Sequence, residues 1–135
     1  MVDIVFDIET APIQENKYIY TDDEGNTKDI GALSPITGRI IAAGWKTSDA
    51  QHIAIDQDEK TLLEDFWNTL KKQANSQPIR LIGFNIKAFD LHFLFVRSLH
   101  HNVPICRYVK IIDLREYLSA FQTYKKKGKL TDYAR

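Results

Sequence analysis

Apolar and polar residues alternate over residues 2–9, at the start of the chain. In an extended chain, one side would carry only apolar side chains, and the other would carry a mixture that ends in two acids. The apolar set is Val2, Ile4, Phe6 and Ile8, and the opposite set is Asp3, Val5, Asp7 and Glu9. The pattern predicts a strand with one buried face and an acidic carboxyl end.

A hairpin and a helix are predicted next. Residues 39–46 and 51–55 are short apolar or alternating runs whose polar connection suits an antiparallel hairpin. The polar stretch before them, residues 10–38, predicts a long loop or a small excursion. Asp56 and Glu59 have the spacing of a capping box at the start of a helix. Helical spacing of the apolar residues supports that helix: Leu62, Leu63, Phe66, Trp67 and Leu70.

The second half of the chain predicts alternating strands and helices. Residues 79–84 form a short apolar strand, and residues 108–112 form another. Asp113 and Glu116 have capping-box spacing for a final helix. Between the two strands, helical spacing is shown by Leu91, Leu94, Phe95 and Leu99. Strands alternating with helices after a hairpin predict an α/β fold with a mixed sheet, as one domain over residues 1–135.

Composition narrows the class of protein. With 44% hydrophobic residues, the chain can bury a core, so disordered and fibrous classes are excluded. Its apolar runs are too short to cross a bilayer, and the N-terminus lacks the pattern of a signal peptide. The single cysteine, Cys106, fits a reducing compartment. We expect a cytoplasmic protein without a membrane partner.

The overall charge gives no support for binding to a phosphate backbone, because 18 basic residues balance 18 acidic ones. A basic run at residues 125–129 offers a local positive site. A solvated loop is the better interpretation of that run. An enzyme that holds a few nucleotides through metal ions needs no basic surface.

The acids at the ends of two strands form the candidate chemistry. Asp7 and Glu9 share a face where the first strand ends, and Asn85 and Asp90 follow strand 79–84. If the two strands are neighbours, three carboxylates converge and repel one another unless cations neutralise them. Oxygen ligands suit Mg²⁺ or Mn²⁺, and two ions roughly 4 Å apart can orient a water for attack on a phosphodiester.

Each acidic motif alone has a simpler interpretation. An Asp-x-Glu pair arises often by chance, and an aspartate near a helix start is more often a cap than a metal ligand. Their joint context strengthens the hypothesis. An apolar strand ends in the sequence 6–10, a second ends at residues 83–85, and Phe89-Asp90-Leu91 opens a helix.

These motifs resemble those of the DEDD-type 3′–5′ exonucleases of the ribonuclease H-like fold, and most closely the proofreading domains of family B DNA polymerases. Residues 6–10 look like the first exonuclease motif, and residues 83–90 look like the second. Residues 34–40 are similar to the segment that leads into the second strand. The resemblance implies a sheet of five strands, the second antiparallel to the rest, with helices on its faces.

The resemblance also assigns roles to individual residues. Asp7 would bridge two metal ions, Glu9 would hold the ion that activates water, and Asp90 would help to hold the other. The 3′-terminal nucleotides of single-stranded DNA, with RNA also open, would be contacted by Thr10, Asn85 and Phe89. The ring of Phe89 would stack on any base, although a place in the core explains it equally well.

The family's third motif, a Tyr or His followed by a fourth metal-binding Asp, is missing from the sequence. Residues 129–135 resemble the segment before it, so we expect a C-terminally incomplete domain. Possible substitutes have simpler explanations as caps, helix ends or surface residues; they are Asp113, Asp132, Tyr117, Tyr133, His92, His100 and His101.

Three functional hypotheses therefore remain open. The first is a metal-dependent exonuclease or its N-terminal portion. The second is a catalytically incomplete module that binds nucleic-acid ends or a partner protein. The third is an α/β scaffold with solvated acids. The sequence leaves open the choice of DNA or RNA, the identity of a general base and the oligomeric state.

Overall fold

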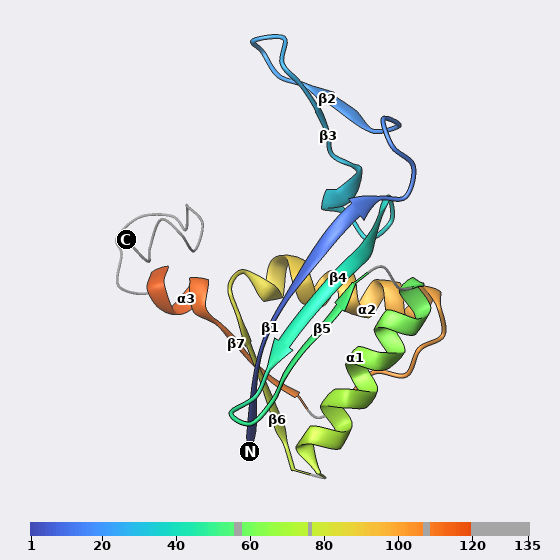
Figure 1. Ribbon diagram of the computed structural model, residues 1–135. Coiled ribbons are helices and arrows are strands. Elements are labelled where there is room, and N and C mark those ends of the chain that lie inside the picture. The colour runs from blue at the N-terminus through green and yellow to red at the C-terminus, as the bar shows by residue number, and fades with distance from the viewer. Residues whose placement is uncertain (56–57, 76, 107–108, 120–135) are drawn as a thin grey trace.

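A mixed five-stranded sheet forms the centre of the computed structural model, which describes residues 1–55, 58–75, 77–106 and 109–119 (Figure 1). The strand order is β5-β4-β1-β6-β7. Only β4 runs against the others, because it pairs antiparallel with both β1 and β5, whereas β1, β6 and β7 are parallel. The strands are β1 Val2–Pro12, β4 Gly38–Lys46, β5 Gln51–Ile55, β6 Ile79–Gly83 and β7 Val109–Asp113. This is the predicted sheet, with the second of its five strands antiparallel.

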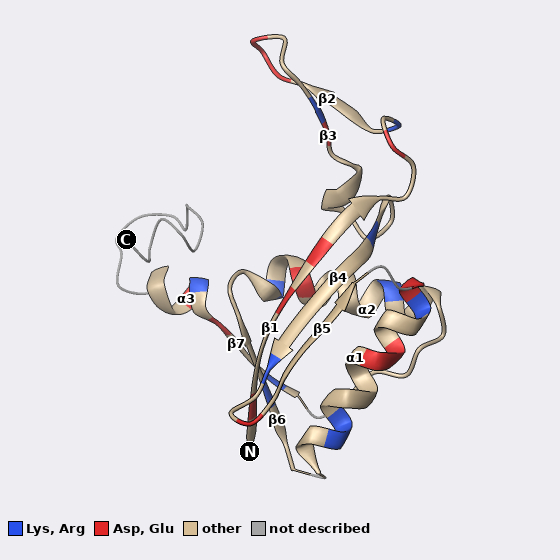
Figure 2. Cartoon of the chain, viewed as in Figure 1, with Lys and Arg blue, Asp and Glu red and all other residues tan. Residues whose placement is uncertain are grey.

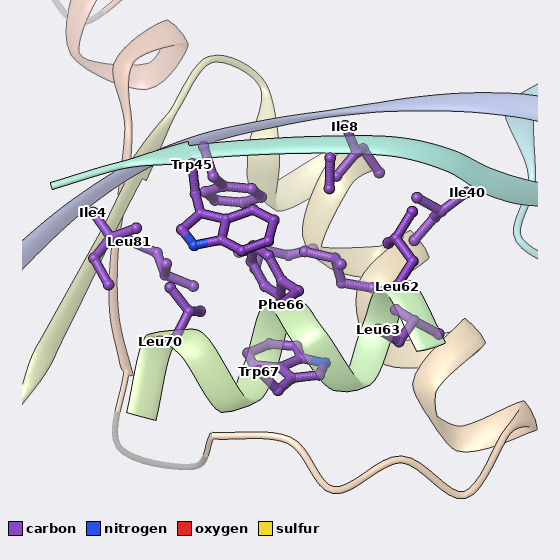
Figure 3. Packing of buried hydrophobic residues seen from close by; sticks show 14 of the residues in the cluster. Ile4, Ile8, Ile40, Trp45, Leu62, Leu63, Phe66, Trp67, Leu70 and Leu81 are labelled. Atoms are coloured by element: carbon purple, nitrogen blue, oxygen red, sulfur yellow. The ribbon is translucent and has the colours of Figure 1, made fainter. Parts of the chain in front are cut away.

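Two long helices cover one face of this sheet. Helix α1 (Glu59–Ala74) packs on β4 and β5, and α2 (Leu91–His100) packs on β4 and α1. Figure 3 shows apolar side chains of β1 and β4 pointing toward those of α1. Phe66 lies at the centre, with its ring 5.1 Å from that of Trp45 and 5.0 Å from that of Trp67. The alternation predicted for β1 is confirmed, since Ile4, Phe6 and Ile8 are buried there.

The predicted capping box of α1 is wrong. The cap is Asp58, whose side chain accepts a hydrogen bond from the Thr61 N–H, and Asp56 lies outside the described residues. Glu59 turns into the core instead, where it accepts from the Ile40 N–H at 2.6 Å and pairs with Arg97. The buried guanidinium of Arg97 needs an anionic partner, and this need outweighs the local capping pattern.

The inner face of α2 differs in part from the prediction. Leu91 and Leu94 are buried as expected, but Phe95 is 36% exposed and Leu99 is 78% exposed. Polar Arg97 and Ser98 take inner positions because Arg97 pairs with Glu59 and Ser98 accepts from the Trp67 indole N–H. A count of apolar residues cannot detect polar side chains that are buried with partners.

The polar stretch between β1 and β4 forms a small excursion, as predicted. It contains a hairpin of β2 (Ile19–Thr21) and β3 (Thr27–Asp29), followed by the 3₁₀ turn Gly31–Leu33. The hairpin projects from the end of the sheet at which β1 finishes (Figure 1). At the opposite end of the chain, α3 (Leu114–Ser119) follows β7 directly. The residues that follow β6 and β7 are neighbours, because Gly83 at the end of β6 lies opposite Asp113 at the end of β7.

Candidate metal centre

β1 does not end at the two acids as predicted but continues to Pro12, and its acidic residues lie on the face of the sheet opposite α1 and α2. Asp7 and Glu9 are both exposed there, as the alternation of β1 requires. Acidic residues along this strand are marked in Figure 2. Strand β6 runs beside β1 in parallel, with Val5 opposite Ile82. The prediction that the two strands carrying the acidic motifs are neighbours is thus confirmed.

A compact turn carries the chain from β6 to Asp90. Asn85 adopts a left-handed conformation with φ of 59°, and residues Ile86–Asp90 form a single π turn before α2. Gly83 allows the close approach, since a Cβ there would collide with the Ile86 side chain and lie 3.1 Å from the Phe6 carbonyl oxygen. π turns often occur at functional sites, where the extra residue redirects a side chain.

The carboxyl group of Asp90 reaches across to β1. Asp90 is 5% exposed, and its Oδ2 accepts a hydrogen bond of 3.2 Å from the Ile8 N–H. When the Asp90 carboxyl group is protonated, it can donate a hydrogen bond to the neighbouring Asp7 side chain. Although Asp90 precedes α2 directly, its side chain does not cap that helix. The simpler interpretation as a helix cap is therefore wrong.

Two effects make this carboxyl group hard to ionise. Burial and, second to it, the nearby Asp7 carboxylate raise the pKa of Asp90 to about 7, against the opposing effect of the Ile8 N–H. Near neutral pH, the Asp90 carboxyl group therefore keeps its proton easily. A divalent cation placed beside both oxygens would replace that proton and relieve the repulsion. The donor set of this pair fits a hard cation.

Glu9 and Thr10 complete the predicted end of β1, but with different surroundings. Glu9 is exposed on the Asp7 face, while the Thr10 hydroxyl donates to the Ala32 carbonyl oxygen at 2.8 Å. The β1–β4 register shifts between these two residues. Within the described ranges, no three His, Cys, Asp or Glu side chains form a group that could hold a metal ion. The structure brings Asp7 and Asp90 together and leaves Glu9 apart from them.

The two other predicted nucleotide contacts are anchored within the protein. The Asn85 side-chain oxygen accepts from Arg115 Nη1 at 3.2 Å. Phe89 is half-buried against the core, with its ring centre 5.0 Å from that of Phe93. Sequence reasoning missed Arg115, because an arginine on a short helix gives no motif by itself. Its position just after a parallel strand was the available signal.

The substitutes for the missing fourth ligand lie elsewhere or have other partners. The exposed ones are His92, His100 and Tyr117. The His101 ring nitrogen contacts Glu59 at 2.7 Å, and Asp113 accepts from three backbone N–H groups. Asp132, Tyr133 and the basic run 125–129 lie outside the described residues.

An open groove of about 480 Å³ runs beside Asp7 on the face away from α1 and α2. Its walls come from β1, β4, β5, the end of β6 and the first residue of α3. Val5 and Ile53 give it apolar surface, and Lys46 gives it a cation.

No described helix is long and apolar enough to cross a membrane.

Comparison with known proteins relates this chain to a family of predicted exonucleases and to DNA polymerases. Residues 40–132 match a family described as predicted 3′–5′ exonucleases related to the exonuclease domain of PolB. An uncharacterized protein of Methanocaldococcus jannaschii is 40% identical over 107 residues, which make up 76% of this chain and 58% of that protein. The DNA polymerase of Archaeoglobus fulgidus is 31% identical over 75 residues, or 56% of this chain and 9% of the polymerase.

A solved structure supports the fold. The family B DNA polymerase of the hyperthermophilic archaeon Pyrobaculum calidifontis superimposes with a TM-score of 0.63 and 18% identity. The match covers 90% of this chain and 16% of that polymerase. The chain thus spans only part of each of these relatives, including 58% of the M. jannaschii protein. The sheet order, the parallel motif-bearing strands and the family match agree, and the chain belongs to the family of predicted 3′–5′ exonucleases related to the exonuclease domain of PolB.

Proposed function

We propose that this chain is a metal-dependent exonuclease domain that hydrolyses phosphodiester bonds at single-stranded 3′ ends, in the cytoplasm. The proposal takes single-stranded DNA as the substrate, with RNA as a second possibility to be tested. Its main support is the buried Asp90 carboxyl group held against that of Asp7, an arrangement that is unfavourable when both are ionised. Such pairs are typical of sites that bind cations.

The metal ligands in this proposal are Asp7, Glu9 and Asp90. Asp7 and Asp90 are already in contact, and Glu9 extends from the same face of β1 one alternation further along. Two Mg²⁺ or Mn²⁺ ions would supply a water of lowered pKa and charge stabilisation for the leaving 3′ oxygen. The Ile8 N–H holds Asp90 Oδ2 in place, so one carboxylate is oriented before any ion binds.

The 3′-terminal nucleotides would lie over the turn that leads to Asp90. Asn85 directly precedes this turn and Phe89 lies within it, next to Asp90, while Thr10 follows Glu9 on β1. The half-buried ring of Phe89 keeps part of its surface accessible for stacking. The amide of Asn85 is oriented by Arg115 and can donate to a sugar or phosphate oxygen.

The direct test compares Asp7→Asn and Asp90→Asn with Asp3→Asn. Asp3 lies on the same strand and the same face but pairs with Arg80 at 2.7 Å, so it is a matched control for loss of one negative charge. Calorimetry measures Mn²⁺ binding, and a 5′-labelled single-stranded oligonucleotide reports trimming from its 3′ end. We expect the Mn²⁺ affinity and the rate of 3′-end trimming each to fall by at least about 100-fold in the two site variants. In the Asp3→Asn control, we expect both to stay unchanged. Equal trimming by all three variants would refute the proposal.

A binding module is the second candidate function. It is favoured by the observation that the described residues gather two carboxylates and not a group of three. Such a module would hold a single-stranded end or a partner protein without cleaving it. Saturable binding of the oligonucleotide with no trimming in Mn²⁺ would support it, and the same binding in the Asp7→Asn variant would show that no metal is needed.

A further inference from the structure

Asp113 is the most buried acid in the described chain, at 3% exposure. It ends β7, next to the end of β6, and Gly83 lies opposite it in the parallel register. Its position places a carboxylate directly beside the turn that carries Asp90, although Asp113 itself lies outside the acidic pair.

The Asp113 carboxylate accepts three backbone hydrogen bonds, using both oxygens. Oδ1 accepts from the Asn85 N–H at 2.8 Å and from the Arg115 N–H at 3.0 Å. Oδ2 accepts from the Lys87 N–H at 3.1 Å. Only the Arg115 bond belongs to the capping of α3, and the other two lie on the turn between β6 and α2.

These two bonds hold the turn at the two positions where its backbone departs from ordinary helix or strand geometry. Asn85 has the left-handed conformation, which is unfavourable for most residues, and Lys87 lies within the π turn. At both positions, the backbone N–H donates to a charged acceptor. Such a hydrogen bond is stronger than one to a neutral acceptor. Side-chain contacts add to this attachment, since Arg115 binds Asn85 and Lys87 pairs with Glu116 at 3.0 Å.

We propose that Asp113 is a positioning residue that holds the turn from Asn85 to Asp90 so that the Asp90 carboxyl group meets Asp7. This inference rests on the proposed function, because it treats Asp90 as a metal ligand. Asp113 itself does not contact the ions or the substrate. Its carboxylate acts through the backbone of the turn, and a displaced turn would separate the two acids.

The test uses Asp113→Asn in the full chain. Asparagine is as good a helix cap as aspartate, so the Arg115 bond and α3 are retained. Its amide offers an oxygen on one side only, and the NH₂ group on the other side faces the Lys87 N–H without accepting from it. We expect Mn²⁺ affinity to fall by about tenfold or more in calorimetry. We also expect amide exchange at Lys87 to accelerate by at least about tenfold, which NMR measures without metal.

Asp58→Ala is the matched control, because it removes the side chain that caps α1, a different helix from the one into which the turn leads. This variant should lower Tm while leaving Mn²⁺ affinity and Lys87 exchange as in the wild type. Wild-type affinity and wild-type exchange in Asp113→Asn would overturn the positioning role. Failure of the proposed function is distinguishable: Asp90→Asn would then bind Mn²⁺ normally, and Lys87 exchange in Asp113→Asn would still show whether Asp113 holds the turn.

Discussion

Glu59 and Asp90 are both buried acids, at 7% and 5% exposure, but their surroundings are opposite in character. Burial alone would raise the pKa of Glu59, yet hydrogen bonds from Arg97, the Ile40 N–H and His101 hold that pKa below its usual range. The pKa of Asp90 instead rises to about 7, because burial and the Asp7 carboxylate oppose ionisation. Each acid sits at the start of a helix, so local sequence does not separate them.

The partners of the two acids indicate which acid stabilises the fold and which one serves the proposed chemistry. Glu59 accepts hydrogen bonds from the Ile40 N–H of β4 and from the Arg97 guanidinium of α2. These bonds join the two helices to the sheet. Asp90 accepts from the Ile8 N–H and from its own backbone N–H, and its other partner is an acid, Asp7. A fold gains nothing from the second arrangement unless another group completes it. We therefore assign Glu59 to stability and Asp90 to the proposed chemistry.

The largest expected effect comes from Glu59→Gln. The substitution leaves the buried Arg97 guanidinium without its anion, so the free energy of unfolding at pH 7 should fall by about 3 kcal/mol. Urea denaturation measures this loss. Glu64→Gln, on the exposed side of the same helix, should change stability little. Equal effects of the two changes would remove the contrast on which the comparison depends.

Asp90→Asn should change stability in the opposite direction. In metal-free protein, the raised pKa means that the native state holds a proton between pH 4 and 7 that the unfolded state has released, so stability falls as pH rises through this window. The variant should remove this slope and be more stable at pH 8, by about 2 kcal/mol, because solvent screening lessens the effect of the pKa shift on stability. Unfolding free energies at pH 4, 6 and 8 measure it. A steeper fall in the variant than in the wild type would contradict the argument.

A smaller effect should follow from Gly83→Ala, which tests the geometry that brings Asp90 to Asp7. The added Cβ collides with the buried Ile86 side chain, so the turn must shift, at a cost of about 1–3 kcal/mol. Gly44→Ala is the control, because the nearest atom to a Cβ there is 3.8 Å away. Thermal unfolding compares the two variants. Mn²⁺ binding should weaken only in Gly83→Ala.

The sequence predicted the part of the site that depends on strand order. Alternation along β1 placed Asp7 and Glu9 on one face, and the rule that ligands gather at the carboxyl ends of parallel strands brought Asp90 to the same edge. Both predictions needed only local periodicity and one assumption about neighbouring strands. The parallel pairing of β1 with β6 confirms that assumption.

The parts that could not be predicted depend on pairs of polar residues that are distant in sequence. Arg97 is buried only because Glu59, 38 residues away, faces it. Asp113 has the spacing of a helix cap, and its bonds to Asn85 and Lys87 depend on the register between β6 and β7. The left-handed Asn85 and the π turn likewise have no distinct hydrophobic pattern. Tertiary context decides all of these.

The bond between the Ile8 N–H and Asp90 joins residues 82 positions apart, and this separation bears on the kinetics of folding. The antiparallel pairs β1–β4 and β4–β5 close shorter loops than the parallel pair β1–β6, so we expect β6 and its turn to dock late. Repulsion between Asp7 and Asp90 is then absent from the transition state. Raising the pH should therefore accelerate unfolding of the metal-free protein and leave its folding rate nearly constant.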